Sequence, residues 1–370
     1  MLLFVAVDDP RTLQTAQGVC ARSVLAALQA CEETELVVIP GMTHRGLRRR
    51  VAQAGGLVGG KTTLEGTVNL DDVVRGVRAA IERTKARAVI FNHMRAAAAI
   101  ARWEGPQPVP FVYMSQNREA VAAESLIELA GGFQSFVLRQ DARRLRALED
   151  EVLLRCDHSV ALTEEDARRF EEICAPERVA TLPPPLEEGS MPVVEGSGFP
   201  NRVSLISSFL WAPKRWNGQW LAREVMPQVW ESSPEAELHL VGARADKIGV
   251  DGPRIKVWSD VPDVRPHYGD AGVLLVPERQ RSGLKFKTIQ SGFAGRAIVS
   301  TGGGLEGTGL VDGRSALVAE SAREFAEAIV RLLKDDDLRR DLGTAARAAV
   351  TAHFDPAALT ARYRAFVGSL

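Results

Sequence analysis

The sequence predicts an α/β protein with two doubly wound domains that face a central cleft. Short apolar runs of strand length alternate with helical segments in both halves of the chain, as in parallel sheets covered by helices. The length of 370 residues is long for one domain and suits two. Residues 181–200 are rich in Pro, Gly, Glu and Ser and separate the halves like a linker. Ligands are therefore expected at the carboxyl ends of the strands.

The composition is that of an ordinary soluble globular protein, with 45% hydrophobic and 25% charged residues. The net charge of −1 gives no case for nucleic-acid binding. The four cysteines form no CxxC motif or ligand cluster and are expected to be reduced thiols of a cytoplasmic chain. No apolar run approaches the length of a membrane span, and a strand that begins at Leu2 leaves no room for a signal peptide. Any membrane contact is expected to be peripheral.

The first half begins with a βαβ pattern that predicts a parallel sheet with right-handed crossovers. No GxGxxG follows the first strand, so the dinucleotide-binding fingerprint is absent. The third strand ends in His93, which makes His93 the strongest ligand-facing candidate among six histidines. A satisfied structural histidine is the alternative. Strands are expected at 2–7, 35–40, 88–93, 111–117 and 158–163, and helices at 15–30, 71–83, 139–154 and from 164, with Thr163 as a cap.

Residues 44–51 predict a basic amphipathic helix that is rich in arginine. One interpretation is a solvated arginine face. The other is a patch for an anionic acceptor or for a membrane surface. The following stretch, to about residue 70, is rich in Gly and Thr and is expected to be a loop.

The second half repeats the alternation of strands and helices. Strands are expected at 202–207, 238–242, 255–258, 272–277 and 297–301, and helices at 217–230, from Phe286 to a C-cap at Gly295, and at 322–333, 336–350 and 356–366. The acidic run at 335–337 is expected to be a solvated helix cap rather than a metal site. The three glycines at 302–304 predict either a flexible turn or backbone that approaches a ligand closely.

The stretch from Gly283 to Gln290 follows a buried strand and opens a helix. A glycine at this turn lets backbone approach a ligand, and the first amides of the helix can hold an anion. Lys285 and Lys287 place two ammonium groups at the same helix start. A solvated basic helix end is the alternative.

An ordered set of motifs runs through residues 202–350. It comprises Trp211 and Pro213, Trp220-Leu221, Pro227, Leu240-Val241-Gly242, Asp260-Val261-Pro262-Asp263, Gly283-Leu284-Lys285-Phe286-Lys287, Gly295-Arg296-Ala297-Ile298-Val299-Ser300-Thr301 and Gly304-Leu305-Glu306-Gly307. In this order the motifs resemble the donor domain of GT-B glycosyltransferases, and most closely glycosyltransferase family 4 (group 1). The first half resembles the acceptor domain of that family more weakly, at 117–119, at Glu149 and at 156–163.

The resemblance implies two Rossmann-like domains and a transfer reaction. It places an acceptor-binding domain at 1–182, a linker at 183–200, a nucleotide-sugar donor domain at 201–352 and a helix that crosses back to the first domain at 353–370. The implied activity transfers a sugar from a UDP- or GDP-sugar to a glycan, glycolipid or small molecule, with retention and without a metal or another cofactor. The implied location is cytoplasmic, with residues 44–51 as an optional peripheral contact to the inner face of the membrane.

The resemblance also implies the residues of the site. His93 and Lys287 are expected to take part in catalysis, and either Lys214 or Arg215 joins Lys287 at the donor diphosphate. Backbone between Trp258 and Val261 is expected to meet the base. The full donor-binding set is Lys214, Arg215, Trp258, Val261, Ser282, Gly283, Leu284, Lys285, Phe286 and Gln290. The set on the acceptor or sugar side is Asn117, Arg118, Gly303, Gly304 and Glu306.

One departure from the family pattern concerns two acids. Many family 4 members carry a Glu, seven further residues and a second Glu where this chain has Ser282 and Gln290. The Gln290 amide can still accept hydrogen bonds from ribose hydroxyls, whereas Ser282 is a poorer substitute for a carboxylate. This departure supports a second hypothesis, a non-catalytic GT-B scaffold or partner subunit that binds nucleotide sugar weakly or not at all. A nucleotide-sugar epimerase on the same fold is a third, less favoured hypothesis.

Overall fold

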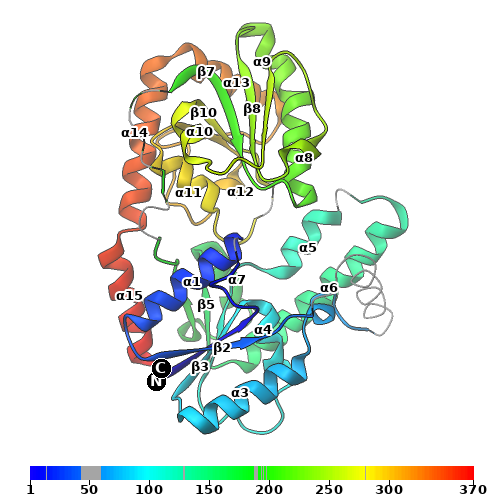
Figure 1. Ribbon diagram of the computed structural model, residues 1–370, viewed down its shortest axis with the longest axis vertical. Helices are drawn as coiled ribbons and strands as arrows, with labels where there is room; N and C mark the ends of the chain where they lie inside the picture. The colour runs from blue at the N-terminus through cyan, green and yellow to red at the C-terminus, as the bar shows by residue number, and fades with distance from the viewer. Residues whose placement is uncertain are drawn as a thin grey trace. The chain divides into compact units, whose positions relative to one another are not determined.

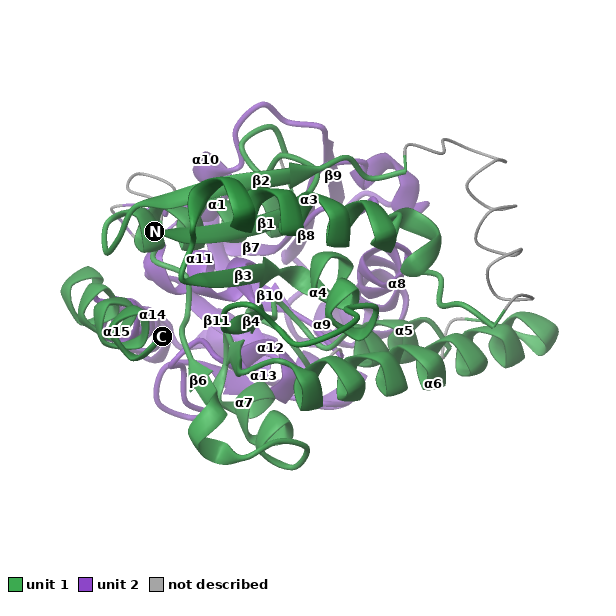
Figure 2. Cartoon of the chain, turned by 90° about the horizontal axis from the view of Figure 1, so that it is seen from below, with its two compact units in different colours: residues 1–186, 282–284, 356–370 green, residues 187–281, 285–355 purple. Residues whose placement is uncertain are grey.

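The computed structural model describes residues 1–13, 15–42, 60–127, 130–186, 191–192, 194, 196, 198–279 and 281–370 (Figure 1). The chain divides into two units (Figure 2). Unit 1 consists of Met1–Leu186, Ser282–Leu284 and Pro356–Leu370, and unit 2 consists of Glu187–Arg281 and Lys285–Asp355. The basic helix predicted at 44–51 lies outside the described residues.

Unit 1 is built on a parallel sheet of six strands in the order β2-β1-β3-β4-β5-β6. The strands are β1 (Leu2–Val7), β2 (Thr34–Ile39), β3 (Ala88–Asn92), β4 (Phe111–Met114), β5 (His158–Ala161) and β6 (Val179–Thr181). β1, β3 and β4 are buried along their whole length, as expected for a parallel sheet with both faces covered. The strand order reverses between β1 and β3, so the carboxyl ends of these two strands form the switch point at which such sheets bind ligands.

The helices of unit 1 confirm the main sequence expectations and add two elements. They are α1 (Ala16–Gln29), α3 (Leu70–Thr84), α4 (His93–Ala101), α5 (Glu119–Ile127), α6 (Gly132–Arg155), α7 (Glu164–Glu171) and α15 (Pro356–Ser369), with short 3₁₀ turns at Glu65–Thr67 and Pro176–Arg178. Thr163 caps α7 as predicted, because its Oγ1 accepts the backbone N–H of Asp166 at 3.1 Å. α4 and α5 are absent from the sequence prediction, since their alanine-rich sequences lack a polar face at helical spacing.

Several boundaries in unit 1 differ from the prediction. The helix expected to begin at Arg139 begins at Gly132, and the short strand β6, which is absent from the sequence prediction, ends at the first residue of the linker-like stretch 181–200. The last helix, α15, belongs to unit 1, where Arg87 donates a hydrogen bond to the backbone carbonyl of Val367 at 2.7 Å. No helix in the described ranges is long and apolar enough to cross a membrane.

Unit 2 is built on a second parallel sheet of six strands, in the order β12-β11-β10-β7-β8-β9. The strands are β7 (Phe199–Ile206), β8 (Glu237–Gly242), β9 (Ile255–Ser259), β10 (Ala271–Val276), β11 (Ala297–Ser300) and β12 (Leu317–Val318). The order reverses between β7 and β10, which places the switch point of this sheet at the carboxyl ends of those two strands. The predicted α/β class with two doubly wound sheets is confirmed.

The helices of unit 2 correct one predicted helix start. They are α8 (Ala212–Trp220), α9 (Met226–Ser232), α10 (Arg265–Asp270), α11 (Phe286–Phe293), α12 (Gly302–Leu305), α13 (Ala322–Lys334) and α14 (Asp336–His353), with a π-helical turn at Leu221–Val225 and a 3₁₀ turn at Ala245–Ile248. The helix expected from Asn217 begins at Ala212, because Pro213 is well tolerated in a first helical turn. The acidic run caps α14 as predicted, since the Asp335 carboxylate accepts the N–H of Leu338 at 2.9 Å.

The three glycines at 302–304 do not form a flexible turn, which corrects that alternative. They begin the short helix α12, directly after β11. A Cβ on Gly304 would lie 2.2 Å from Ser300 Oγ and 2.9 Å from the carbonyl oxygen of Val276. Glycine is therefore required there by close packing against the ends of β10 and β11.

Candidate functional site

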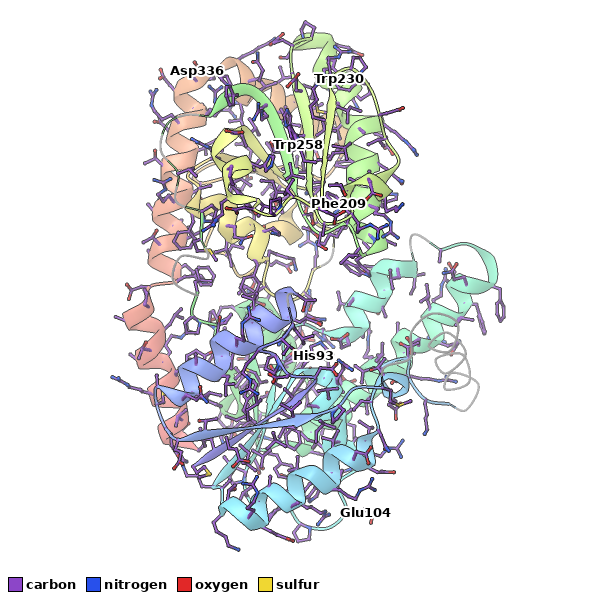
Figure 3. All side chains as sticks on the ribbon, viewed as in Figure 1. His93, Glu104, Phe209, Trp230, Trp258 and Asp336 are labelled. Atoms are coloured by element: carbon purple, nitrogen blue, oxygen red, sulfur yellow. The ribbon has the colours of Figure 1, made fainter. Side chains whose placement is uncertain are left out.

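His93 lies directly after β3, at the carboxyl edge of the unit 1 sheet (Figure 3). Its backbone is left-handed, with φ 67°, which is uncommon for a residue with a Cβ. The ring Nδ1 accepts the backbone N–H of Arg95 at 3.2 Å, while Nε2 lies 3.0 Å from Glu119 Oε1 and 2.9 Å from the amide nitrogen of Gln17. With Nδ1 as an acceptor, the neutral ring carries its proton on Nε2 and donates it to Glu119, and the Gln17 amide must then turn its oxygen rather than its nitrogen toward Nε2. His93 is therefore held as a hydrogen-bond donor rather than as a free base.

The residues at the end of β4 and after it contact two glutamates, Glu119 and Glu149. Asn117 donates its amide N–H to Glu119 Oε1 at 3.2 Å. Arg118 Nε donates to Glu149 Oε2 at 3.3 Å, and the Tyr113 hydroxyl donates to the other oxygen of Glu149 at 3.1 Å. Glu149 is fully buried, and this burial raises the pKa of its carboxyl group to about 7. Both predicted acceptor-side residues of unit 1, Asn117 and Arg118, therefore lie close to Glu119, the partner of His93.

Ser282, Gly283 and Leu284 belong to unit 1. Ser282 Oγ accepts the backbone N–H of Arg118 at 2.6 Å, and the backbone N–H of Gly283 donates to a carboxylate oxygen of Asp166 at 2.7 Å. Gly283 has φ 71°, and a Cβ there would lie 2.8 Å from the carbonyl oxygen of Gln116. The sequence predicts that the Gly283 amide can hold a bound anion. In the structure this amide donates to the carboxylate of Asp166.

The carboxyl ends of β7 and β10 bring three charged side chains of unit 2 together. Lys214 lies on α8, Glu278 lies two residues after β10, and Lys287 lies in the first turn of α11. Lys214 Nζ forms an ion pair with Glu278 Oε1. Burial, and then the nearby Lys214 ammonium, lower the pKa of Lys287 to about 8. Within the described part of the chain Lys287 makes no ion pair, so the group of two ammoniums and one carboxylate carries an excess positive charge that suits an anionic ligand.

The two candidates for the second basic residue, Lys214 and Arg215, have different surroundings. Arg215 donates two hydrogen bonds of 2.8 Å, to the backbone carbonyls of Phe209 and Leu210. These bonds fix the loop between β7 and α8. Lys214 rather than Arg215 thus lies beside Lys287, and Arg215 supports the backbone that carries it.

The remaining donor-side residues of α11 have defined places. Lys285 is the N-cap residue, and the half-buried Phe286 is the first residue of the helix. Gln290 Oε1 accepts the hydroxyl of the buried Tyr268 at 3.1 Å. This bond uses one lone pair of the amide oxygen and leaves its second as an acceptor site.

The predicted sugar-side residues of unit 2 cluster at α12. Gly303 is buried there, and the carbonyl of Gly304 accepts the Thr288 hydroxyl at 2.7 Å, which joins α12 to α11. Glu306 follows α12, and its Oε1 lies 3.4 Å from Arg281 Nη1. The structure therefore places these glycines beside the helix that carries Lys287.

The predicted base-binding stretch begins at the end of β9. Trp258 is 43% exposed, and its indole N–H donates to His239 Nδ1 at 3.2 Å. Asp260 has φ 52°, and its carboxylate accepts the backbone N–H of Arg244 at 3.0 Å. Val261 follows this turn and is half-buried. The turn lies at the carboxyl edge of the unit 2 sheet, on its edge strand.

Two carboxylates outside the set of predicted site residues lie in these clusters. Glu119 contacts His93, and Glu278 contacts Lys214. Glu278 follows a predicted strand end, so the criterion that selects His93 would also have found it. In the described residues, no group of three or more His, Cys, Asp or Glu side chains is placed to hold a metal ion.

Comparison with known proteins agrees with the two-sheet architecture. A family model described as glycosyl transferases group 1 matches residues 200–335. A search of the curated proteins gives no match. The structure is similar to sucrose-phosphate synthase from Thermosynechococcus elongatus, with a TM-score of 0.72, 15% identity and coverage of 100% of this chain and 99% of that one.

Two further solved structures share the fold at low identity. HepE of Anabaena, in complex with UDP and glucose, has a TM-score of 0.67 and 12% identity, over 100% of this chain and 99% of HepE. WaaG, a glycosyltransferase involved in lipopolysaccharide biosynthesis, has a TM-score of 0.61 and 16% identity, over 99% of each chain. Residues 200–335 therefore match the family model of the group 1 glycosyltransferases, and the whole chain shares the GT-B fold of these solved structures.

Proposed function

We propose that the chain transfers a sugar from a nucleotide-sugar donor to a hydroxyl group of an acceptor. The observation that carries this proposal is the pair of ammonium groups of Lys214 and Lys287 at the switch point of unit 2. A donor diphosphate is the anion that such a pair would bind, and the first turn of α11 adds backbone N–H groups. Both lysines come from the domain that matches the group 1 glycosyltransferases.

In the proposed reaction, the bond between the anomeric carbon and the donor phosphate oxygen breaks. A bond forms between the anomeric carbon and the acceptor oxygen, and the acceptor proton passes to the leaving diphosphate. Lys214 and Lys287 stabilise the negative charge that develops on that diphosphate. We infer retention of anomeric configuration and a reaction without a metal or another cofactor, as in similar enzymes. Nuclear magnetic resonance of the product and assays with a chelator test these two points.

The comparison structures favour a uridine donor over the wider choice of UDP- and GDP-sugars. HepE of Anabaena is described in complexes with UDP and glucose and with UDP-glucose. We therefore infer a UDP-sugar as the donor class of this chain. The turn from Trp258 to Val261 is the proposed contact for the base.

On the other side of the reaction, we propose His93 as a donor of a hydrogen bond to the sugar or the acceptor. Its Nε2 proton points to Glu119, in a cluster with Asn117 and Arg118 that a hydroxyl-bearing ligand could join. The remaining inferences are a cytoplasmic location, an optional peripheral membrane contact through residues 44–51, and the domain limits 1–182, 183–200, 201–352 and 353–370.

Isothermal titration of Lys287→Ala with UDP and UDP-sugars tests the proposal. A charge-assisted hydrogen bond contributes about 2 kcal/mol, so we expect the affinity to fall about 30-fold. Lys334→Ala, at an exposed position of α13, is the matched control and should keep wild-type affinity. Equal affinity of Lys287→Ala and wild type would show that the lysine does not hold the diphosphate. Wild-type protein that binds no nucleotide sugar or free nucleotide would favour the non-catalytic scaffold instead.

A further inference from the structure

Glu278 is a buried carboxylate at the centre of the unit 2 switch point. It is 9% exposed and lies at the carboxyl end of β10. Its backbone is held on both sides, since its N–H donates to the carbonyl of Val276 at 2.9 Å and its carbonyl accepts the hydroxyl of Thr301. The carboxylate forms an ion pair with Lys214. A buried charge is stable only when it is paired. A ligand that binds the Lys214 ammonium must therefore also supply a new partner for the Glu278 carboxylate.

The loop that carries Glu278 is clamped by its next residue. The Arg279 guanidinium lies over the ring of Trp216, 4.1 Å from its centroid, and 5.8 Å from the ring centroid of Trp220. These contacts are cation–π interactions with two stacked tryptophans of α8, the helix that also carries Lys214. The Arg279 contacts therefore hold the loop after β10, which carries Glu278, against α8, which carries Lys214.

A diphosphate at Lys214 and Lys287 would change the surroundings of this carboxylate. It would compete for the Lys214 ammonium and bring negative charge next to Glu278. The negative charges of the diphosphate and of the Glu278 carboxylate repel each other, so a free nucleoside diphosphate beside Glu278 makes an unfavourable contact. Hydroxyl groups attached to the diphosphate would remove this conflict, because each can donate a hydrogen bond to a carboxylate oxygen.

We propose that Glu278 reads the hydroxyl groups of the donor's sugar and thereby discriminates a nucleotide sugar from the free nucleotide. This inference rests on the proposed function, in that Lys214 and Lys287 must hold a diphosphate. The carboxylate accepts hydrogen bonds from the sugar once the diphosphate has taken its place at Lys214. Without a sugar, the same carboxylate keeps Lys214 paired and opposes the nucleotide. A polyhydroxylated sugar directly bonded to the diphosphate is the ligand part that this geometry selects.

The test compares the affinities of UDP and of the tightest-binding UDP-sugar in one protein. For Glu278→Ala and Glu278→Gln we expect UDP to bind about fivefold more tightly, because a repulsive charge is gone. We expect the UDP-sugar to bind about tenfold more weakly to Glu278→Ala, because its hydroxyls lose a charged acceptor. The ratio of the two dissociation constants thus falls about 50-fold in Glu278→Ala, and by less in Glu278→Gln, whose amide oxygen still accepts. Circular dichroism checks that each variant is folded.

Two controls separate failure of this inference from failure of the proposed function. Glu327→Ala, an exposed glutamate on α13, changes the charge of the domain equally and should leave the ratio unchanged. Lys214→Ala should weaken both ligands and hold the ratio near its wild-type value. If both ligands bind but Glu278→Ala shifts them in parallel, the sugar-reading role is wrong while diphosphate binding stands. If wild type binds no UDP and no UDP-sugar, the proposed function is wrong and this inference falls with it.

Discussion

The buried carboxyl group of Glu149 gives a quantitative prediction for unit 1. It is fully buried, it accepts hydrogen bonds from Tyr113 and Arg118, and burial raises its pKa from 4.5 to about 7. One pKa unit between the folded and unfolded states corresponds to about 1.4 kcal/mol. Because the folded pKa is the higher one, the protonated group stabilises the native state below pH 4.5. This contribution, of about 3 kcal/mol, is lost as the pH rises through 7.

Glu149→Gln removes this titration, while its amide oxygen can still accept from Tyr113. The unfolding free energy of the variant, relative to wild type, should therefore rise by about 3 kcal/mol between pH 4.5 and 8. Urea unfolding followed by pulsed hydrogen exchange in peptides of unit 1 measures both proteins at each pH. Glu151→Gln, at an exposed position on the same helix, is the control and should keep the wild-type pH profile. A relative free energy that stays constant within about 0.5 kcal/mol would refute the argument from burial.

Two further predictions concern unit 2. Above pH 8, where Lys287 loses its proton, the affinity of wild type for UDP should fall by up to about tenfold per pH unit. Lys287→Arg should flatten this pH profile, because a guanidinium stays charged. Titration calorimetry between pH 7 and 10 measures both proteins, and identical pH profiles would contradict the role of Lys287. Gly304→Ala should destabilise unit 2 by about 1–3 kcal/mol, because its Cβ meets Ser300 Oγ at 2.2 Å. Thermal unfolding measures the loss, with Gly368→Ala, which has open space around the new Cβ, as the control that unfolds like wild type.

Much of the secondary structure could be predicted because its signals are local. The apolar runs at 2–7 and 272–277 form β1 and β10 with the predicted bounds or within one residue of them. Thr163 and the acidic run at 335–337 were recognisable as caps, since capping depends on a side chain and an amide only a few residues apart. The helices α4 and α5 escaped prediction because their alanine-rich sequences show no polar face.

Part of the candidate site was predictable. Residues recognised from the local sequence were selected, whereas partners that lie far apart in the sequence were not. His93 and Lys287 could be selected because each lies at the end of a recognisable strand or at the start of a recognisable helix. The different surroundings of Lys214 and Arg215 could not be predicted, because they depend on which side chain the backbone carbonyls of the same loop engage. The partners Glu119 and Glu278 also escaped selection, since an ion pair across two elements leaves no local pattern.

By itself, the sequence determined the alternation of strands and helices, the α/β class and the positions of the strand ends at which charged groups could gather. Only the tertiary structure decided which of those ends meet. β7 and β10 are neighbours in the unit 2 sheet, although strands β8 and β9, three α-helices and two short helical turns separate them along the chain. This pairing brings Lys214, Glu278 and Lys287 together. The physical reason is that strand order is set by the packing of whole elements, whereas strand and helix formation is set by residues close in sequence.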